Sequence, residues 1–300
     1  MKGLISAVKR MEIHDGEGLR TTVFFKGCPL RCIWCHNPES IGFDRQMAHF
    51  SEKCVGCGGC VSVCPQHALA YADDHVRIDR ELCVGCGECA EACPTGAMII
   101  YGRGYDAEQL VALVARDKPF FDRSGGGVTL SGGECLAQAD FAVEVARLLF
   151  KRGISVDIDT CGQIDRAVLD RILPYTDTFL YDIKAMDPEV HRRCTGHTNE
   201  RILDNLRYLS ECGARIEIRY PLVMGYNDGE CDKIGAFLKG LKGIVKIKVL
   251  QYHPFVASRY EALGTTCTMP DAITTVEDVQ SAVDRLKAYA LNAVNGAKED

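Results

Sequence analysis

Cysteine is the residue type whose number and spacing point most directly to chemistry in this sequence. The chain of 300 residues holds 17 cysteines, and eleven of them lie between Cys28 and Cys93. Disulfides are typical of small exported chains, whereas this chain is long and residues 1–10 lack the pattern of a signal peptide. We therefore expect a cytoplasmic protein whose clustered cysteines bind metal, and the spacing indicates which metal.

Two cysteine runs repeat one spacing, C-x2-C-x2-C-x3-C followed by proline. The first run is Cys54, Cys57, Cys60 and Cys64, and the second run is Cys83, Cys86, Cys89 and Cys93. This pattern is typical of bacterial ferredoxins with two [4Fe–4S] clusters, in which each cluster takes three thiolates from one run and the fourth from the other. The expected sets are Cys54, Cys57, Cys60 and Cys93 for one cluster, and Cys83, Cys86, Cys89 and Cys64 for the other. The alternative, a pair of zinc knuckles, is usually built from two well-separated C-x2-C pairs. Taken alone, the two runs indicate electron transfer.

A third group has the different spacing C-x3-C-x2-C and consists of Cys28, Cys32 and Cys35. Three thiolates can hold a [4Fe–4S] cluster but leave one iron without a protein ligand. An open coordination position on a metal centre is typical of a reaction site rather than a structural one. The alternatives are a zinc site completed by His36 and cysteines that bind no metal.

The loop that carries this third group resembles the cluster-binding loop of the radical S-adenosylmethionine superfamily. The resemblance implies that the methionyl amino and carboxylate groups of the cofactor chelate the open iron. It also implies that an electron passed into the sulfonium splits the cofactor into methionine and a 5′-deoxyadenosyl radical. Three [4Fe–4S] clusters and S-adenosylmethionine are therefore the expected cofactors, with no catalytic side chain beyond them.

Outside residues 43–103, apolar and β-branched segments alternate with helical patterns. Strands are expected at 20–26, 127–130, 154–159, 178–183, 215–220 and 245–250, and helices at 106–117, 141–152, 165–173, 199–212 and 276–294. Six βα units in a row favour a parallel α/β sheet curled into an open barrel. We expect residues 1–42 and 104–300 to form a partial (β/α)6 barrel, with residues 43–103 as an inserted ferredoxin-like α+β domain.

Polar residues and glycines follow the expected strands at the end where βα barrels carry their chemistry. In strand order they are the three cysteines at Cys28, Cys32 and Cys35, then Gly132, Gly133 and Glu134, then Asp159 and Thr160, then Asp182 and Lys184, then Arg219, and finally His253. Each has an ordinary alternative, such as a Gly-Gly turn or a surface ion pair. Their expected convergence at one edge of the sheet indicates a binding site.

The superfamily resemblance assigns roles to these residues. Gly132–Glu134 resembles the GGE motif that holds the methionyl amino group, and Asp182–Lys184 resembles a D-x-K motif that contacts the cofactor. Asp159–Thr160 resembles a site for a monovalent cation beside the cofactor carboxylate. Arg219 suits a carboxylate or ribose because a guanidinium binds anions well. His253, which precedes a proline, resembles a cofactor contact.

The segment His14–Thr22, together with the three-cysteine loop and Asn37–Ser40, closely resembles glycyl radical enzyme activating enzymes. The resemblance covers nearly the whole chain. It implies that the radical abstracts a hydrogen from a backbone glycine of a partner glycyl radical enzyme, with flavodoxin or ferredoxin as the reductant. The ferredoxin-like insert marks the subgroup that serves decarboxylases, C–N, C–O or C–S lyases and their relatives. One departure is Glu17, where the family usually has proline.

Composition and charge argue against some classes of partner, and two alternative functions stay open. Hydrophobic residues make up 47% and the formal net charge is −6, with no dense basic run, so neither nucleic acid nor a membrane is expected as a partner. A radical enzyme acting on a small molecule or peptide usually carries its extra clusters in a C-terminal extension. A pure electron carrier would not need the three-cysteine site.

The other six cysteines show no ligand spacing and are expected to be buried or half-buried, with Cys135 and Cys161 beside the site.

Overall fold

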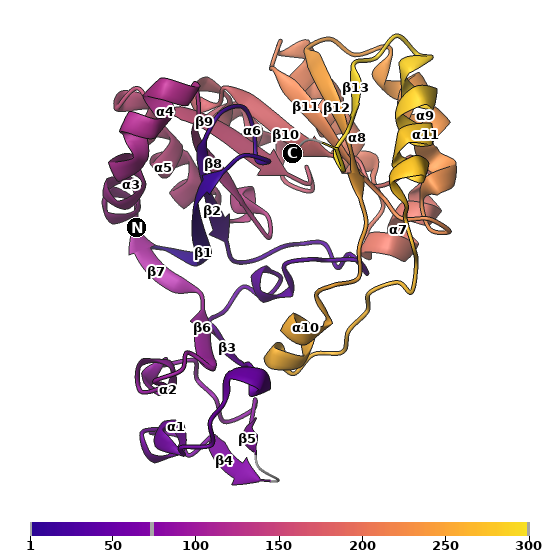
Figure 1. The fold of residues 1–300 in the computed structure, drawn as a ribbon. Coiled ribbons are helices and arrows are strands. Elements are labelled where there is room, and N and C mark those ends of the chain that lie inside the picture. The colour runs from indigo at the N-terminus through magenta and orange to yellow at the C-terminus, as the bar shows by residue number, and fades with distance from the viewer. Residues whose placement is uncertain (1, 73–74, 299–300) are drawn as a thin grey trace.

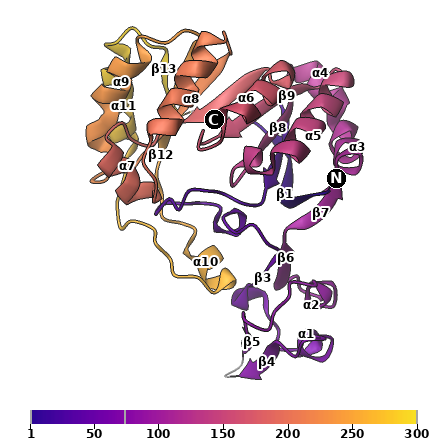
Figure 2. The same cartoon turned by 180° about the vertical axis from the view of Figure 1, so that it is seen from behind.

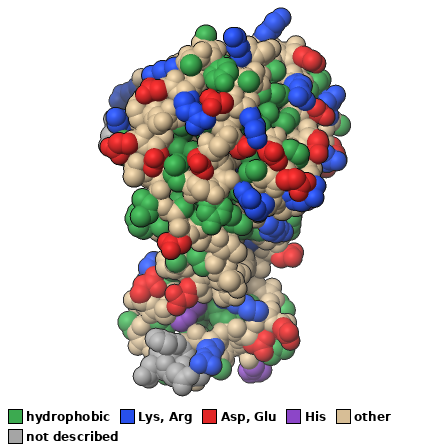
Figure 3. Space-filling model, turned by 90° about the vertical axis from the view of Figure 1, so that its right-hand side faces the viewer, with side chains coloured by type: hydrophobic (Ala, Val, Ile, Leu, Met, Phe, Trp, Pro, Cys, Tyr) green, Lys and Arg blue, Asp and Glu red, His purple; other side chains and the backbone are tan. Residues whose placement is uncertain are grey.

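The computed structural model describes residues 2–72 and 75–298. Most of the chain forms one α/β body, and the segment from β3 to β6 projects from it as a smaller unit (Figures 1 and 2). Figure 3 shows the narrow neck that joins the two parts. Within the described residues, none of the helices is both long and apolar enough to cross a membrane.

The body is built on a nine-stranded sheet with the order β13-β12-β11-β10-β9-β8-β2-β1-β7. The six strands predicted from the sequence are present, adjacent and parallel, and β1 and β7 extend the sheet in antiparallel fashion. The bounds are β1 (Lys2–Glu12), β2 (Arg20–Phe25), β7 (Arg103–Asp106), β8 (Gly127–Gly132), β9 (Ser155–Thr160), β10 (Thr178–Asp182), β11 (Ile216–Leu222), β12 (Ile244–Gln251) and β13 (Ala293–Asn295).

Helices connect the parallel strands, as the alternating pattern predicted. Their bounds are α3 (Ala107–Val114), α4 (Lys118–Ser124), α5 (Ala139–Lys151), α6 (Arg166–Ile172), α7 (Pro188–Thr195), α8 (Glu200–Glu211), α9 (Cys231–Leu238), α10 (Ala257–Leu263) and α11 (Val276–Lys287). Asp106 caps α3 in a capping box with Gln109. The prediction of a helix over 276–294 is wrong at its end. The helix stops at Lys287, Ala290 takes a positive φ of 61°, and the chain turns into β13.

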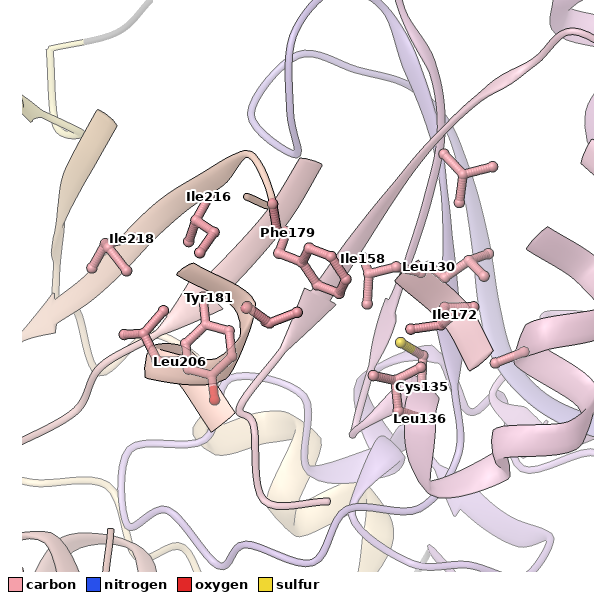
Figure 4. Close-up of a cluster of buried hydrophobic side chains, with 14 of the residues drawn as sticks. Leu130, Cys135, Leu136, Ile158, Ile172, Phe179, Tyr181, Leu206, Ile216 and Ile218 are labelled. Carbon is pink, nitrogen blue, oxygen red and sulfur yellow. The ribbon is translucent and has the colours of Figure 1, made fainter. Parts of the chain in front are cut away.

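Alternation along the strands separates an apolar core from a polar face. In β11, Ile216 and Ile218 lie in the core, while the intervening Glu217 lies with charged groups on the opposite face. Period-two alternation is what a strand requires when its two faces meet different surroundings. Figure 4 shows the core side, where Ile158 and Phe179 of neighbouring strands pack among the helices. The sheet therefore has one side for stability and one side available for a polar site.

The projecting unit consists of two short antiparallel strand pairs and two single-turn helices. Strand β3 (Gln46–His49) pairs with β6 (Met98–Tyr101), and β4 (Leu69–Ala72) pairs with β5 (His75–Ile78). Helices α1 (Gly59–Ser62) and α2 (Glu88–Glu91) each contain the third cysteine of one run. A small core of Met47, Leu69, Val76 and Met98 packs with the cysteines.

Candidate functional site

A cavity of about 400 Å³ opens at the carboxyl ends of the parallel strands. Most of the predicted site residues line it, and they come from loops far apart in the sequence. The lining includes Cys28, Cys32, Cys35, Gly132, Gly133, Asp159, Thr160, Asp182, Lys184 and His253. Among the residues predicted at the strand ends, Glu134 and Arg219 do not line it, because their side chains lie behind the cavity wall, and the predicted cysteines of the insert lie elsewhere.

The three-cysteine loop is held in place mainly by hydrogen bonds between its backbone and neighbouring segments. The N–H of Cys28 donates to Ile41 O at 3.1 Å, and that of Ile33 donates to Cys194 O at 2.9 Å. The Tyr260 hydroxyl donates to Cys35 O at 2.9 Å. Burial raises the pKa of the Cys32 thiol to about 12 and that of Cys35 to about 11. Binding of a metal cluster at this loop must therefore displace protons from the sulfurs.

Two glycines at the end of β8, Gly132 and Gly133, allow the backbone there to pack closely against β2 and the loop that follows β2. Gly132 has φ +115°, and a Cβ atom built there would lie 2.2 Å from Phe25 N. A Cβ at Gly133 would lie 2.4 Å from Ser40 O. No side chain fits at either position, so both must be glycine. The exposed backbone that results forms one wall of the cavity.

Glu134 is fully buried and its carboxylate is turned into the protein. It accepts hydrogen bonds from Thr160 Oγ1 and Cys161 N, each at 2.8 Å, and from Leu136 N at 3.1 Å. Burial raises the pKa of this carboxyl group above its usual range, although the three donors oppose that shift. In this conformation Glu134 holds the loop after β9 in place.

An ion pair stands on another side of the cavity. Lys184 Nζ lies 2.7 Å from Asp182 Oδ2. Burial opposes the charge of Lys184, but the attraction of Asp182 and Cys32 outweighs it and raises the lysine pKa. Lys184 therefore stays positively charged beside the three-cysteine loop, where a bound anionic group or thiolate would gain from it.

Arg219 lies beneath the cavity and joins β11 to the loop between β1 and β2. Its guanidinium donates to His14 O at 3.0 Å and lies 3.4 Å from Asp15 and 3.5 Å from Asp159. Burial raises the pKa of Asp159 to about 6 despite this arginine. Ser131 Oγ donates to Asp159 at 2.6 Å. Arg219 thus acts on the cavity through Asp159 rather than by lining it.

Two imidazoles close the rim between the loops after β2 and β12. The rings of His36 and His253 lie 4.3 Å apart, and a ring nitrogen of His36 is 2.9 Å from His253 O. This bond engages one of the two ring nitrogens of His36. Beyond His253, the ring of the exposed Phe255 stacks at 5.4 Å.

Three buried asparagines shape the rim and were not found from the sequence. Asn205 donates to the carbonyls of Gly162 and Ile164, and Asn199 donates to those of Ala185 and Met186. Asn227 donates to Lys184 O and Pro221 O and accepts from Val223 N. Each ties two loop carbonyls from other segments together. A lone asparagine in a helix or loop pattern gives no signal of this role.

Two small cavities in the projecting unit are each lined by four cysteines. One is lined by Cys54, Cys57, Cys60 and Cys93, and the other by Cys64, Cys83, Cys86 and Cys89. Both sets combine three residues of one run with the last cysteine of the other, as the spacing predicted. Among residues 2–72 and 75–298, no three or more His, Cys, Asp or Glu side chains lie in an arrangement that could hold a single metal ion.

The remaining six cysteines differ in their surroundings. Cys135 is buried in the core (Figure 4), and Cys161 lines the main cavity. Four of the six are buried: Cys135, Cys161, Cys194 and Cys231. The expectation of burial is wrong for Cys212 and Cys267, which are exposed. Each lies at or beyond a helix end, where the chain leaves the core.

Comparison with known proteins agrees with this geometry. The profile of the Radical SAM superfamily matches residues 22–238. The trans-4-hydroxy-L-proline dehydratase activating enzyme of Clostridioides difficile is 43% identical over 88% of both chains. The choline trimethylamine-lyase activating enzyme of Oleidesulfovibrio alaskensis is 40% identical over 88% of this chain and 87% of its own. The benzylsuccinate synthase activating enzyme of Thauera aromatica is 39% identical over 87% and 82%.

A solved structure supports the fold. SuiB of Streptococcus suis, bound to its precursor peptide SuiA, aligns with 89% of this chain and 46% of its own at a TM-score of 0.55 and 12% identity. The chain therefore has the radical SAM α/β fold with a mostly parallel central sheet. Because the family profile spans most of the chain and the relatives align over nearly all of it, the chain belongs to the radical SAM superfamily and, within it, to the glycyl radical enzyme activating enzymes.

Proposed function

We propose that this protein activates a glycyl radical enzyme by abstracting a hydrogen atom from a backbone glycine of that partner. The radical that S-adenosylmethionine supplies when it is cleaved at a [4Fe–4S] cluster is the chemistry that this role requires. The names of the relatives support the proposal, because each is an activating enzyme of another enzyme. The protein would act in the cytoplasm.

The residues of the main cavity suit a cluster and S-adenosylmethionine side by side. Cys28, Cys32 and Cys35 would hold the cluster through three thiolates; their loop offers no fourth cysteine, and Cys161 reaches the same cavity from the end of β9. A cavity of about 400 Å³ lies directly beside them and is the right size for a small cofactor. The fit is supported further by Lys184, a buried cation next to sulfurs that become anionic on binding.

The other lining residues would bind and orient the cofactor. The backbone at Gly132 and Gly133, supported by Glu134 behind it, would meet the methionyl amino group. Asp182, Lys184 and His253 would contact the rest of the cofactor, and Arg219 would act through Asp159. Asp159 and Thr160 would hold a monovalent cation beside the carboxylate, since hard oxygen ligands suit such ions.

The projecting unit would hold two further [4Fe–4S] clusters in the two four-cysteine sets. Two observations support a ferredoxin-like domain at residues 43–103. The cavities combine the two runs in the interlaced manner of bacterial ferredoxins, and the unit has its own small core. Residues 1–42 and 104–300 would then be the partial (β/α)6 barrel. Flavodoxin or ferredoxin would supply electrons to the insert.

The observation that carries the proposal is the cavity that brings the three-cysteine loop, the Gly132–Gly133 backbone and the Asp182–Lys184 pair together. The test is anaerobic reconstitution followed by incubation with reductant and S-adenosylmethionine. We expect about twelve iron atoms per chain, formation of 5′-deoxyadenosine, and a glycine-centred radical in a partner by electron paramagnetic resonance. A panel of glycyl radical enzymes like those served by the relatives would supply the partner.

The control is Cys32→Ala in the same chain. It should keep about eight iron atoms in the insert and lose cofactor cleavage. Full cleavage activity in this variant would overturn the role of the three-cysteine loop. Cofactor cleavage without a glycyl radical in any partner, but with modification of a small molecule or peptide, would overturn the role as an activating enzyme.

A further inference from the structure

The two cysteine sets of the insert differ in their distance from the body, and the register of one strand pair shows the order. Gln46 pairs with Tyr101, and His49 pairs with Met98 at the other end of β3 and β6. The chain continues from Tyr101 into β7, which pairs with β1 of the central sheet. The Gln46–Tyr101 end is therefore the end nearest the body.

Each cavity is lined by a different part of this pair. The set Cys64, Cys83, Cys86 and Cys89 shares its cavity with Met47, whereas the set Cys54, Cys57, Cys60 and Cys93 shares its cavity with His49 and Met98. Two residues along a strand span about 7 Å. Figures 1 and 2 agree, because α2 of the second run lies closer to the body than α1 of the first run.

Arg45 directly precedes β3, at the neck that joins the projecting unit to the body, and it binds the loop of the second run. Its Nη2 donates to Cys86 O at 3.1 Å. Gly85 and Gly87 have positive φ values, and Cβ atoms built there would lie 3.1 Å from Arg45 Cβ and 3.1 Å from Arg45 Nη2. The loop that carries Cys86 thus packs directly on Arg45, and glycine is needed at both positions for that approach.

The residues just before Arg45 contact the three-cysteine loop. Ile41 O accepts from Cys28 N at 3.1 Å, and Lys26 Nζ donates to Gly42 O at 3.0 Å. The four Cα–Cα steps from Ile41 to Arg45 span at most about 14 Å. A short, continuous connection therefore runs from the backbone of Cys28 through this segment to the backbone of Cys86.

Helix α10 provides a second connection between the same two regions. Tyr260 of α10 donates to Cys35 O, and Ala262 O of the same helix accepts from Arg80 at 3.1 Å. Arg80 lies just before Cys83, the first cysteine of the second run. The first connection ends at Cys86 of the second run and the other at Arg80, three residues before that run, whereas neither ends at residues 54–64.

From these contacts we propose that Cys64, Cys83, Cys86 and Cys89 form the proximal site of the insert, held against the neck by Arg45 as a positioning residue. The set Cys54, Cys57, Cys60 and Cys93 is the distal site, on the side that receives electrons from the protein reductant. One electron leaves the reduced flavodoxin or ferredoxin, which is oxidised, and the three-cysteine site is reduced by one electron without any bond being made or broken. This inference rests on the proposed function.

The first test compares two charge-removing variants, Arg45→Gln and its matched control Lys53→Gln, which precedes Cys54 of the distal set. A cation beside a cluster favours its reduced form. We expect Arg45→Gln to lower the equilibrium constant for one-electron reduction of one cluster about threefold. At 59 mV per tenfold, this lowers the reduction potential of that cluster by about 30 mV. Lys53→Gln should shift a different cluster. A shift of the same cluster by both variants, or none by Arg45→Gln, would overturn the assignment.

The second test measures proximity by paramagnetic resonance. The signal of the three-cysteine site is recognised by its change on addition of S-adenosylmethionine, and a neighbouring reduced cluster speeds its spin relaxation. The double variant Cys86→Ala/Cys89→Ala should lose that enhancement, whereas Cys57→Ala/Cys60→Ala should keep it. The reverse pattern would refute the order. If no signal responds to S-adenosylmethionine in the unaltered protein, the proposed function itself fails, so the two failures are distinguishable.

Discussion

Replacement of Asn227 by alanine should weaken both the fold and the site. Asn227 is 1% exposed, and its side chain makes three hydrogen bonds: to Lys184 O at 2.8 Å, to Pro221 O at 2.7 Å and from Val223 N at 2.8 Å. A typical hydrogen bond contributes about 1 kcal/mol net, and a buried group left without a partner costs about 1–3 kcal/mol. We therefore expect Asn227→Ala to lower the free energy of unfolding by about 3 kcal/mol.

The assay is equilibrium unfolding by urea under anaerobic, reducing conditions, with the midpoint and slope measured for each variant. Asn292→Ala is the control, because its side chain makes one exposed hydrogen bond to Val245 O. It should change stability by less than about 0.5 kcal/mol. Since Lys184 and Pro221 both line the cavity, Asn227→Ala should also raise the Kd of S-adenosylmethionine. A loss below about 1 kcal/mol would show that the three bonds do not act as described.

Three further predictions concern charged groups. Asp182→Asn removes the carboxylate that keeps Lys184 charged and should weaken S-adenosylmethionine binding about tenfold, about 1.4 kcal/mol, measured by calorimetry. The hydrogen bond from Arg10 lowers the pKa of Asp117 in the folded state. The ionised Asp117 therefore stabilises the fold fully above about pH 4, and this contribution is lost as the pH falls through the lower folded pKa. Asp117→Asn should flatten the acid limb of a plot of unfolding free energy against pH. Glu17→Ala breaks one exposed ion pair at 2.6 Å and should change the urea midpoint by the equivalent of less than about 1 kcal/mol; a larger loss would mean that this turn depends on the pair.

Local pattern was sufficient for the elements that position the site. The segments ending at Phe25, Gly132 and Thr160 are short, contain apolar and β-branched residues, and are bounded by glycine or polar residues, so the strands could be predicted from them directly. Strand β1, which lies between β2 and the edge strand β7, was not predicted, because its second half is largely exposed and its pairing with β7 depends on the distant end of the insert. The end of α11 was missed because the turn at Ala290 uses a conformation that alanine seldom adopts.

The candidate site also has features that the sequence predicts and features that it does not. Cysteine spacing predicts how the ligands of the insert are grouped, since the thiolates of a cluster must reach one volume, and the four cysteines of each predicted group line one cavity. Side-chain direction was less accessible. Glu134 follows the glycines in sequence, but the backbone turns its carboxylate toward Thr160 and Cys161 instead of the cavity. That orientation depends on donors supplied by another strand, and a single motif does not contain them.

Lys26 contacts both ends of the projecting unit. Its amine binds Gly42 O where the chain departs, and a Cβ built at Gly102, where the chain returns, would lie 2.9 Å from its Cδ. Segments whose ends lie close together can be gained or lost with little effect on the host. This gives the insert the character of a detachable module. A shortened chain that bridges Gly42 to Arg103 with a few glycines should still form the nine-stranded sheet.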